Sequence, residues 1–141
     1  MDRVKTASRF EADVDSETLA GPSNEAQIHP ASGTHLLLTL KGCRSALIND
    51  ADGLKALAER AAVASGATVL QIVAHRFQPQ GTTVVAVLAE SHASLHTYPE
   101  LSTVFWDCFT CGTSCQPELS EAVLTEALLP AVVNKQVIRR D

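Results

Sequence analysis

Four short apolar runs follow one another in the middle of the chain, and this succession limits the fold more than any other feature. All of them contain β-branched residues, which favour strands, and only short turns separate them. They cover residues 67–75, 82–89, 93–97 and 103–109. Strands joined by such short turns pair mostly antiparallel, because a parallel pair needs a long crossover connection. The pattern therefore predicts an α+β protein and not a doubly wound parallel sheet.

The segments on either side of these runs supply the remaining elements. An apolar run at residues 35–40 predicts a first strand. A helix is expected after a polar cap within residues 49–52 and should end at Gly66, because its apolar residues repeat at helical spacing. A second helix is expected over residues 117–129, where one proline begins the segment and another follows it. The predicted architecture is a mostly antiparallel sheet packed against helices in a two-layer sandwich, in the order β-α-β-β-β-β-α.

The first part of the chain differs in composition from the rest. It includes the polar stretch "DVDSETLAGPSNEAQIHPASG", which contains two prolines and two glycines and shows no useful periodicity. We therefore expect a disordered N-terminal tail over residues 1–33 and a single domain over residues 34–141.

Charge and hydropathy limit the partners and the location. The formal net charge of −5 disfavours a nucleic-acid-binding surface. No apolar run approaches the roughly 20 residues that span a bilayer, and the N-terminus shows no secretory signal. We expect a cytoplasmic protein without nucleic-acid or membrane partners, in which the four cysteines are thiols rather than disulfides.

Three of the cysteines lie close together in "DCFTCGTSC", as Cys108, Cys111 and Cys115. A CxxC spacing is compatible with half of a zinc site or with a redox pair. A zinc site needs a second half, however, and Cys43 is isolated, so no metal is expected. A redox pair usually begins a helix, whereas this segment reads as a strand that places Cys108 and Cys111 on opposite faces. A small thiol-binding or metal-binding module remains an alternative, and Cys111 is the best candidate for a reactive thiol.

The stretch "AESHASLHTYPE", residues 89–100, gathers several reactive side chains. Ser91 lies between Glu90 and His92, which is compatible with a nucleophile beside a base. The segment is not a GxSxG elbow, and no motif indicates an orienting acid or an oxyanion hole. Considered alone, Ser91 is typical of a turn residue.

Four motifs together resemble those of the bacterial S-adenosylmethionine decarboxylase proenzymes. They are "GC" at 42–43, "HRFxPxG" at 75–81, "ESHxSxHTxPE" at 90–100 and "DxFTCG" at 107–112. The resemblance extends over about residues 33–117, and it implies the decarboxylase-like α+β sandwich.

The resemblance implies that the chain is an inactive precursor that cuts itself between Glu90 and Ser91. Ser91 would become a covalent pyruvoyl cofactor at the new N-terminus, which forms a Schiff base with the substrate and accepts electrons during decarboxylation. His96 would serve as the acid–base group of processing, and Thr83 stands where the family usually has a serine that takes part in it. Cys111 would be the acid that reprotonates the substrate carbon.

The substrate side matches the family less closely. Phe77 and Tyr98 align with residues that flank the adenine, although tryptophan is usual at the second position. Glu100 aligns with the acid that binds the ribose hydroxyls. The usual "YGYA" is replaced by "LSTV" at residues 101–104, and an acid of the family is replaced by Arg44.

Several functions therefore remain open. The expected activity is decarboxylation of S-adenosylmethionine to the aminopropyl donor for spermidine synthesis. Because family relatives decarboxylate arginine or ornithine with the same machinery, these amino acids are the alternative substrates. A non-enzymatic paralogue is a further possibility. The resemblance also implies a homo-oligomer of cleaved chains, at least a dimer, with active sites near the interface.

Overall fold

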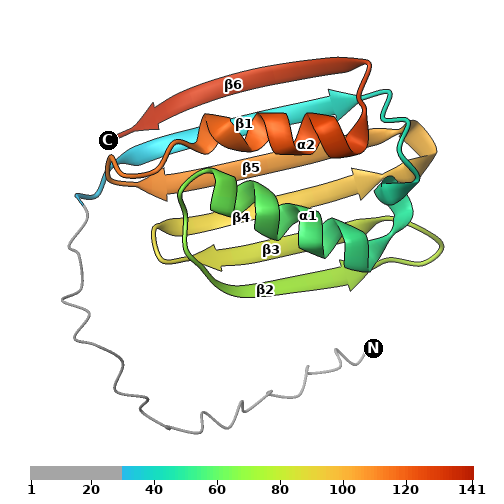
Figure 1. Cartoon of the computed structure of the whole chain (residues 1–141), viewed down its shortest axis with the longest axis horizontal. Coiled ribbons are helices and arrows are strands. Elements are labelled where there is room, and N and C mark those ends of the chain that lie inside the picture. The colour runs from blue at the N-terminus through green and yellow to red at the C-terminus, as the bar shows by residue number, and fades with distance from the viewer. Residues whose placement is uncertain (1–29) are drawn as a thin grey trace, which may run out of the picture.

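The computed structural model describes residues 30–141, so the expected tail at residues 1–33 lies almost wholly outside the described residues. Six strands and two α-helices make up the fold (Figure 1). The strands are β1 (Gly33–Lys41), β2 (Val69–Arg76), β3 (Thr82–Leu88), β4 (Ser91–Tyr98), β5 (Thr103–Cys111) and β6 (Val132–Arg140). The helices are α1 (Ala51–Ala64) and α2 (Ser120–Leu128), and short 3₁₀ turns cover Ala46–Asn49, Pro99–Leu101 and Pro117–Leu119.

The strands form one sheet in the order β2-β3-β4-β5-β1-β6, and every neighbouring pair is antiparallel. Both helices lie across the same face of this sheet (Figure 1). The predicted α+β two-layer sandwich is therefore confirmed. Neither helix within residues 30–141 has the length and apolar character needed to cross a bilayer.

The first helix forms where the sequence predicts it. The Asp50 carboxylate caps its start by accepting a hydrogen bond of 3.1 Å from the Gly53 N–H. Its buried face consists of Leu54, Leu57, Ala58, Ala61 and Ala62. Gly66, two residues beyond the last helical residue, has a φ of +86°, a conformation that favours glycine and lets the chain leave the helix.

The core lies between the helices and the covered face of the sheet. Strand β1 contributes Leu36, Leu38 and Leu40, which are 2% exposed or less. Trp106 on β5 is the largest fully buried side chain, and its indole N–H donates a hydrogen bond of 3.0 Å to the Ser120 hydroxyl at the start of α2. This bond satisfies the polar atom of the indole inside the core.

The sequence prediction omitted the last strand. Residues 132–140 form β6, which pairs with β1 at the edge of the sheet. Most of its residues are exposed, so they lack the inside–outside alternation that reveals a strand in a sequence. The Lys135 ammonium on β6 forms an ion pair of 2.8 Å with Glu121 of α2.

Candidate active site

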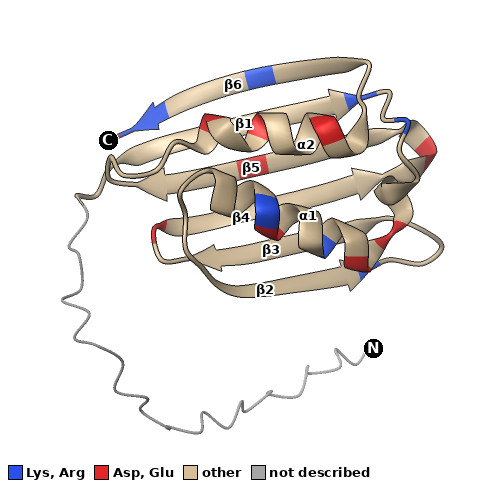
Figure 2. Ribbon diagram, in the orientation of Figure 1, with Lys and Arg blue, Asp and Glu red and all other residues tan. Residues whose placement is uncertain are grey.

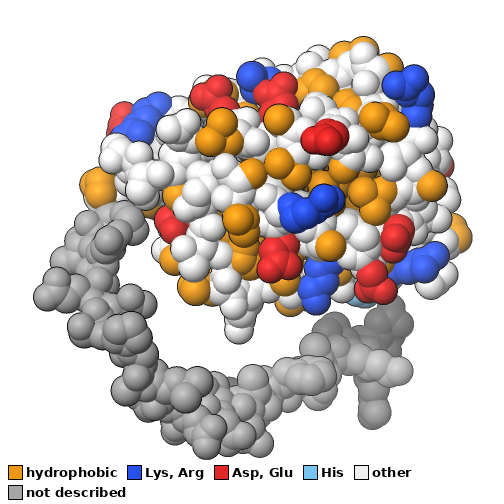
Figure 3. All heavy atoms as spheres, in the orientation of Figure 1, with side chains coloured by type: hydrophobic (Ala, Val, Ile, Leu, Met, Phe, Trp, Pro, Cys, Tyr) orange, Lys and Arg blue, Asp and Glu red, His pale blue; other side chains and the backbone are white. Residues whose placement is uncertain are grey.

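The face of the sheet opposite the helices carries most of the residues singled out by the motifs. Along β4, Ala93, Leu95 and Thr97 are buried beneath the helices, whereas His92 and His96 alternate with them and face the other way. Most charged residues lie on the helices and near the ends of strands, and few lie within the strands (Figure 2). The helix side, in contrast, shows acidic and basic side chains scattered among apolar ones (Figure 3). We call the surface without helices the open face.

The first group of candidate residues lies at the hairpin between β3 and β4. The Glu90 carbonyl oxygen, which belongs to the bond before Ser91, accepts a hydrogen bond of 2.8 Å from the Cys111 backbone N–H. The Glu90 carboxylate accepts another of 3.0 Å from the Thr68 N–H. These two bonds fix both the carbonyl and the side chain of Glu90 before Ser91.

Ser91 itself has an unusual backbone. Its φ of +152° lies in a region that residues other than glycine rarely adopt. Its hydroxyl oxygen lies 2.9 Å from Nδ1 of His92, the next residue. Ser91 therefore combines a strained conformation, which costs about 1–3 kcal/mol, with a side-chain hydrogen bond to an imidazole.

The second group lies at the other end of the same strands. Thr83 on β3 is paired with His96 on β4, and the Thr83 hydroxyl lies 2.5 Å from Nδ1 of His96. The His96 ring is edge-on to Phe77 and Tyr98, with ring centroids 5.9 Å and 4.7 Å away. Tyr98 in turn makes an edge-on contact of 5.9 Å with Phe105. The result is an aromatic surface around one imidazole.

Glu100 lies beside this aromatic surface, in the turn between β4 and β5. Its carboxylate accepts a hydrogen bond of 3.2 Å from the side-chain amide of Gln80, which belongs to the β2–β3 loop. The contact joins two loops at the same end of the sheet. It leaves the second oxygen of Glu100 without a hydrogen bond to another side chain among residues 30–141.

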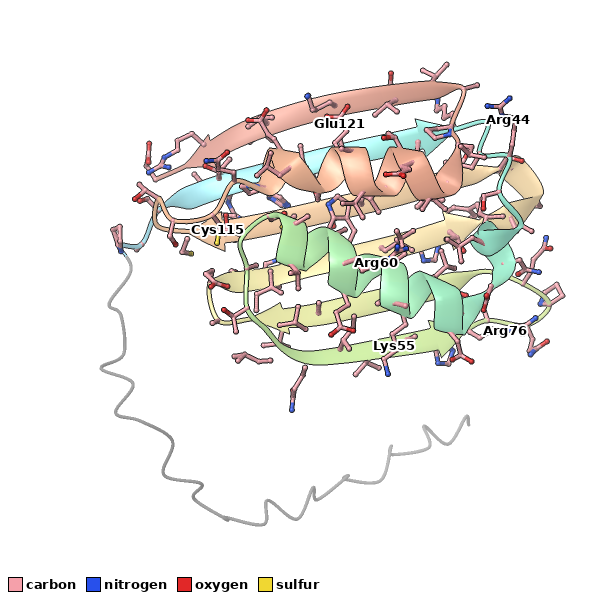
Figure 4. All side chains as sticks on the ribbon, viewed as in Figure 1. Arg44, Lys55, Arg60, Arg76, Cys115 and Glu121 are labelled. Atoms are coloured by element: carbon pink, nitrogen blue, oxygen red, sulfur yellow. The ribbon has the colours of Figure 1, made fainter. Side chains whose placement is uncertain are left out.

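The two groups are far apart within the chain. Ser91 and His96 are separated by five residues of an extended strand, which corresponds to about 16 Å. Figure 4 labels one residue near each end of the sheet. Cys115 follows β5, which ends at Cys111, and Arg44 follows β1, which ends at the other side of the sheet. The structure therefore brings Glu90, Ser91 and Cys111 together, and separately Phe77, Thr83, His96 and Tyr98 with Glu100 nearby.

Comparison with known proteins identifies the family. The model of the S-adenosylmethionine decarboxylase family matches residues 34–141. The chain belongs to this decarboxylase family. The S-adenosylmethionine decarboxylase proenzyme of Methanococcus maripaludis strain S2 is 41% identical over 108 residues, which cover 77% of this chain and 88% of that protein. That of Brevibacillus brevis is 44% identical over 98 residues, covering 70% and 74%.

A solved structure of the same family has the same fold. The crystal structure of the adenosylmethionine decarboxylase from Aquifex aeolicus VF5 matches this chain with a TM-score of 0.70 and 32% sequence identity. The match covers 77% of this chain and 89% of that one.

The positions at which the sequence was expected to depart from the family, residues 101–104 and Arg44, lie at the Glu100 end of the sheet. Residues 101–104 form the turn into β5, where Ser102 has a left-handed φ of +48° and Leu101 is 67% exposed. The Ser102 carbonyl accepts a hydrogen bond of 2.9 Å from the Cys43 N–H, beside the exposed Arg44. These changes are remote from the Glu90–Ser91 bond.

The cysteines of the "DCFTCGTSC" segment do not form a common site. Cys108 is fully buried beneath the helices, and this burial raises the pKa of its thiol to about 12. Cys111 lies on the other face at the end of β5 and is partly exposed. Burial also raises the pKa of the Cys115 thiol. The expected placement of Cys108 and Cys111 on opposite faces is confirmed, which argues against a CxxC metal or redox site.

Sequence reasoning missed two contacts of the candidate site. His92 was considered only as a possible base beside Ser91 and was not assigned to the site, although its side chain contacts the Ser91 hydroxyl. Gln80 and its bond to Glu100 could not be found, because the two loops are 20 residues apart in sequence.

Proposed function

We propose that this chain is a self-cleaving, pyruvoyl-dependent decarboxylase that acts on S-adenosylmethionine and yields the aminopropyl donor for spermidine synthesis. Family membership over residues 34–141 supports the reaction. The observation that carries the self-cleavage is local: a strained Ser91 adjoins a carbonyl that is already polarised by the Cys111 N–H. The domain would be cut between Glu90 and Ser91.

The surroundings of Ser91 fit the formation of a pyruvoyl group from this residue. Attack of the Ser91 hydroxyl on the preceding carbonyl moves negative charge onto the Glu90 oxygen. An N–H at 2.8 Å from that oxygen stabilises the charge as it develops. The strain at Ser91 raises the energy of the uncut chain and favours the reaction. Once formed, the group supplies an electron sink for decarboxylation.

The remaining candidates receive roles that match their positions. We assign His96, held by Thr83, to acid–base steps of processing, and an imidazole suits such steps near neutral pH. We assign Cys111 to reprotonation of the substrate carbon. Its thiol lies at a strand end on the open face and is partly exposed, as a proton donor to a bound ligand must be.

We further infer that two copies of the chain complete each active site. Ser91 and His96 would be about 16 Å apart within one copy, too far for a shared step. The open face also exposes apolar side chains that a second copy could cover: Val73, Val85, Val87 and Phe105 are 43% to 65% exposed. In a two-fold pair, the Ser91 end of one open face can meet the His96 end of the other.

A mixing experiment tests this assembly. Chains carrying Ser91→Ala and chains carrying His96→Ala are synthesised separately and together, and cleavage is followed by intact mass. Neither variant should cut itself alone. In the mixture, the His96→Ala chain should be cut by pairing its Ser91 with the intact His96 of the other chain. If the mixture stays uncut, the two-copy site is contradicted.

Phe77, Tyr98 and Glu100 support S-adenosylmethionine as the substrate. Aromatic edges and faces suit a purine and a sulfonium cation, and a carboxylate suits two ribose hydroxyls. Arginine or ornithine remains the second candidate, because Glu100 can also bind a cationic side chain and because "LSTV" replaces the usual turn. We place the enzyme in the cytoplasm, in keeping with four cysteines that are all free thiols.

Two measurements on the purified protein test the proposed function. Intact mass should show fragments of 90 and 51 residues, the shorter one blocked to Edman sequencing, whereas Ser91→Ala should remain whole. Carboxyl-labelled S-adenosylmethionine, arginine and ornithine should then be compared for CO₂ release. A wild-type chain that never cuts itself would contradict the enzyme assignment. Release of CO₂ only from arginine or ornithine would transfer the assignment to the second candidate.

A further inference from the structure

His92 is the imidazole that contacts the Ser91 hydroxyl in the uncut chain. The Ser91 oxygen lies 2.9 Å from His92 Nδ1, which is hydrogen-bond distance for proton transfer. The same Ser91 adjoins the Glu90 carbonyl that accepts the Cys111 N–H. A nucleophile, a base and an oxyanion donor are thus present at one bond.

The other described histidines do not contact Ser91 in the same copy. Nδ1 of His96 is engaged by Thr83 at the opposite end of β4. His75 lies on β2, where it is paired with Thr83 of β3, and it is therefore at that same end. His35 lies on β1, separated from His92 by the β5 residue Phe109. Of the histidines within residues 30–141, only His92 contacts Ser91 in the same copy.

The position of the His92 ring is defined by its neighbours across the sheet. It is paired with Val87 on β3 and with Phe109 on β5, and its ring centroid lies 5.9 Å from that of Phe109. When the Ser91 hydroxyl donates, Nδ1 accepts through its lone pair and the ring proton resides on Nε2. His92 is exposed, so its imidazole can exchange protons with water between steps.

We propose that His92 is the general base for the first step of self-cleavage. Nδ1 removes the Ser91 hydroxyl proton as the oxygen forms a bond to the Glu90 carbonyl carbon, and the carbonyl electron pair moves onto its oxygen. That oxyanion re-forms the carbonyl as the carbon–nitrogen bond breaks. The imidazolium returns its proton to the leaving nitrogen. The product is an ester between Glu90 and the Ser91 oxygen, with a free Ser91 amine and no net gain or loss of protons.

This inference rests on the proposed self-cleavage and divides its two stages between two histidines. His92 acts in ester formation, whereas His96 is assigned to the later elimination that breaks the ester. The division predicts different intermediates for the two variants. Blocking His92 should leave an ordinary amide bond, and blocking His96 should leave an ester.

The test follows newly synthesised full-length chains by intact mass over time, with and without hydroxylamine, which cleaves esters but spares amides under mild conditions. His92→Ala removes the base, and His92→Asn keeps a hydrogen-bond acceptor near the Nδ1 position without a comparable basicity. Both should form ester and fragments at least about 100-fold more slowly than wild type, and they should resist hydroxylamine. Val63→Ala, which trims an exposed side chain of α1 on the helix side of the sheet, should cut at a rate close to that of wild type.

Circular dichroism and the thermal midpoint establish that each variant is folded, and the exposed position of His92 favours this. Cleavage of His92→Asn within threefold of the wild-type rate would overturn the proposal. Accumulation of a hydroxylamine-sensitive ester in a folded His92 variant would also overturn it, because ester formation would then not need this imidazole. Either result alongside a self-cleaving wild type leaves the proposed function standing. A wild type that stays uncut contradicts both.

Discussion

The backbone N–H of Cys111 lies 2.8 Å from the carbonyl oxygen of Glu90, so the residue assigned as the proton donor in turnover also holds the carbonyl of the bond proposed to break. The main chain and the side chain of one residue thereby receive different tasks. Substitution of the side chain leaves the N–H in place, which makes the two tasks separable by experiment.

Cys111→Ala should therefore still cut itself but should release CO₂ poorly. Fragment formation by intact mass is expected to stay within a few-fold of wild type, whereas the turnover number should fall by 100-fold or more, in the range typical of a lost acid–base group. Cys108→Ala is the matched control. It removes a buried thiol from the covered face and should lower the free energy of unfolding by no more than about 2 kcal/mol while retaining turnover. Equal turnover in both variants would contradict the assignment of Cys111.

The same two thiols should differ in their reaction with iodoacetamide. Burial raises the pKa of Cys108 to about 12, so at pH 8 almost none of it is thiolate, and the helices exclude the reagent. Mass mapping of the folded protein should find Cys108 unmodified while the partly exposed Cys111 is labelled. Rapid labelling of Cys108 in folded protein would show that β5 opens far more readily than its packing indicates.

Relief of strain at Ser91 should be measurable in chains that cannot be cut. Ser91→Gly and Ser91→Ala both remove the nucleophile, but only glycine adopts a φ near +152° without penalty. The glycine variant should be more stable by about 1 kcal/mol, which corresponds to a thermal midpoint roughly 4–8 °C higher. A glycine variant that is less stable than the alanine variant would remove strain from the argument for self-cleavage.

Gln80 should influence substrate affinity without affecting self-cleavage. Its amide donates a hydrogen bond of 3.2 Å to Glu100 and orients that carboxylate. Because the contact is exposed, Gln80→Ala should raise KM for S-adenosylmethionine by only about two- to five-fold, with kcat little changed. Gln71→Ala removes an exposed glutamine near the opposite end of β2 and should leave KM unaltered. A larger fall in kcat than rise in KM would contradict a role in orientation.

His35 should make the stability of the uncut Ser91→Ala chain depend on pH. Burial is the main cause that lowers the pKa of His35, Arg140 and His92 lower it further, and Asp107 opposes them. The unfolded chain, in which the pKa is near about 6.5, therefore binds the proton more readily than the folded chain. His35 thus contributes stability above that pH, and the contribution is lost as the pH falls through the lower folded value. Urea unfolding at several pH values gives the free energy of unfolding as a function of pH. This free energy should change less steeply with pH in His35→Gln, and an unchanged dependence on pH would contradict the prediction.

The sequence was sufficient to predict the helices and most strands of the sheet, because their side chains alternate clearly between core and solvent. Asp50 and Gly66 mark the ends of α1 by local chemistry alone. Strand β6 escaped prediction because its residues are exposed at an edge, where pairing with β1 and not burial defines the strand. The wide separation of Ser91 and His96 could have been predicted from the sequence, because the rise per residue of a strand is known. The Cys111–Glu90 hydrogen bond could not be predicted, because it depends on the register between a hairpin turn and a strand residue 21 positions further along the chain.

The order of strands has a mechanical meaning once the chain is cut. The first fragment would contain β1, α1, β2 and β3, and the second β4, β5, α2 and β6. Strand β1 of the first fragment lies between β5 and β6 of the second, and β3 is paired with β4. The pieces are thus interlaced, and they cannot separate without breaking three ladders of hydrogen bonds and opening the core. Loss of the peptide link would leave a two-chain molecule whose melting temperature rises with protein concentration, although its native shape is that of a single domain.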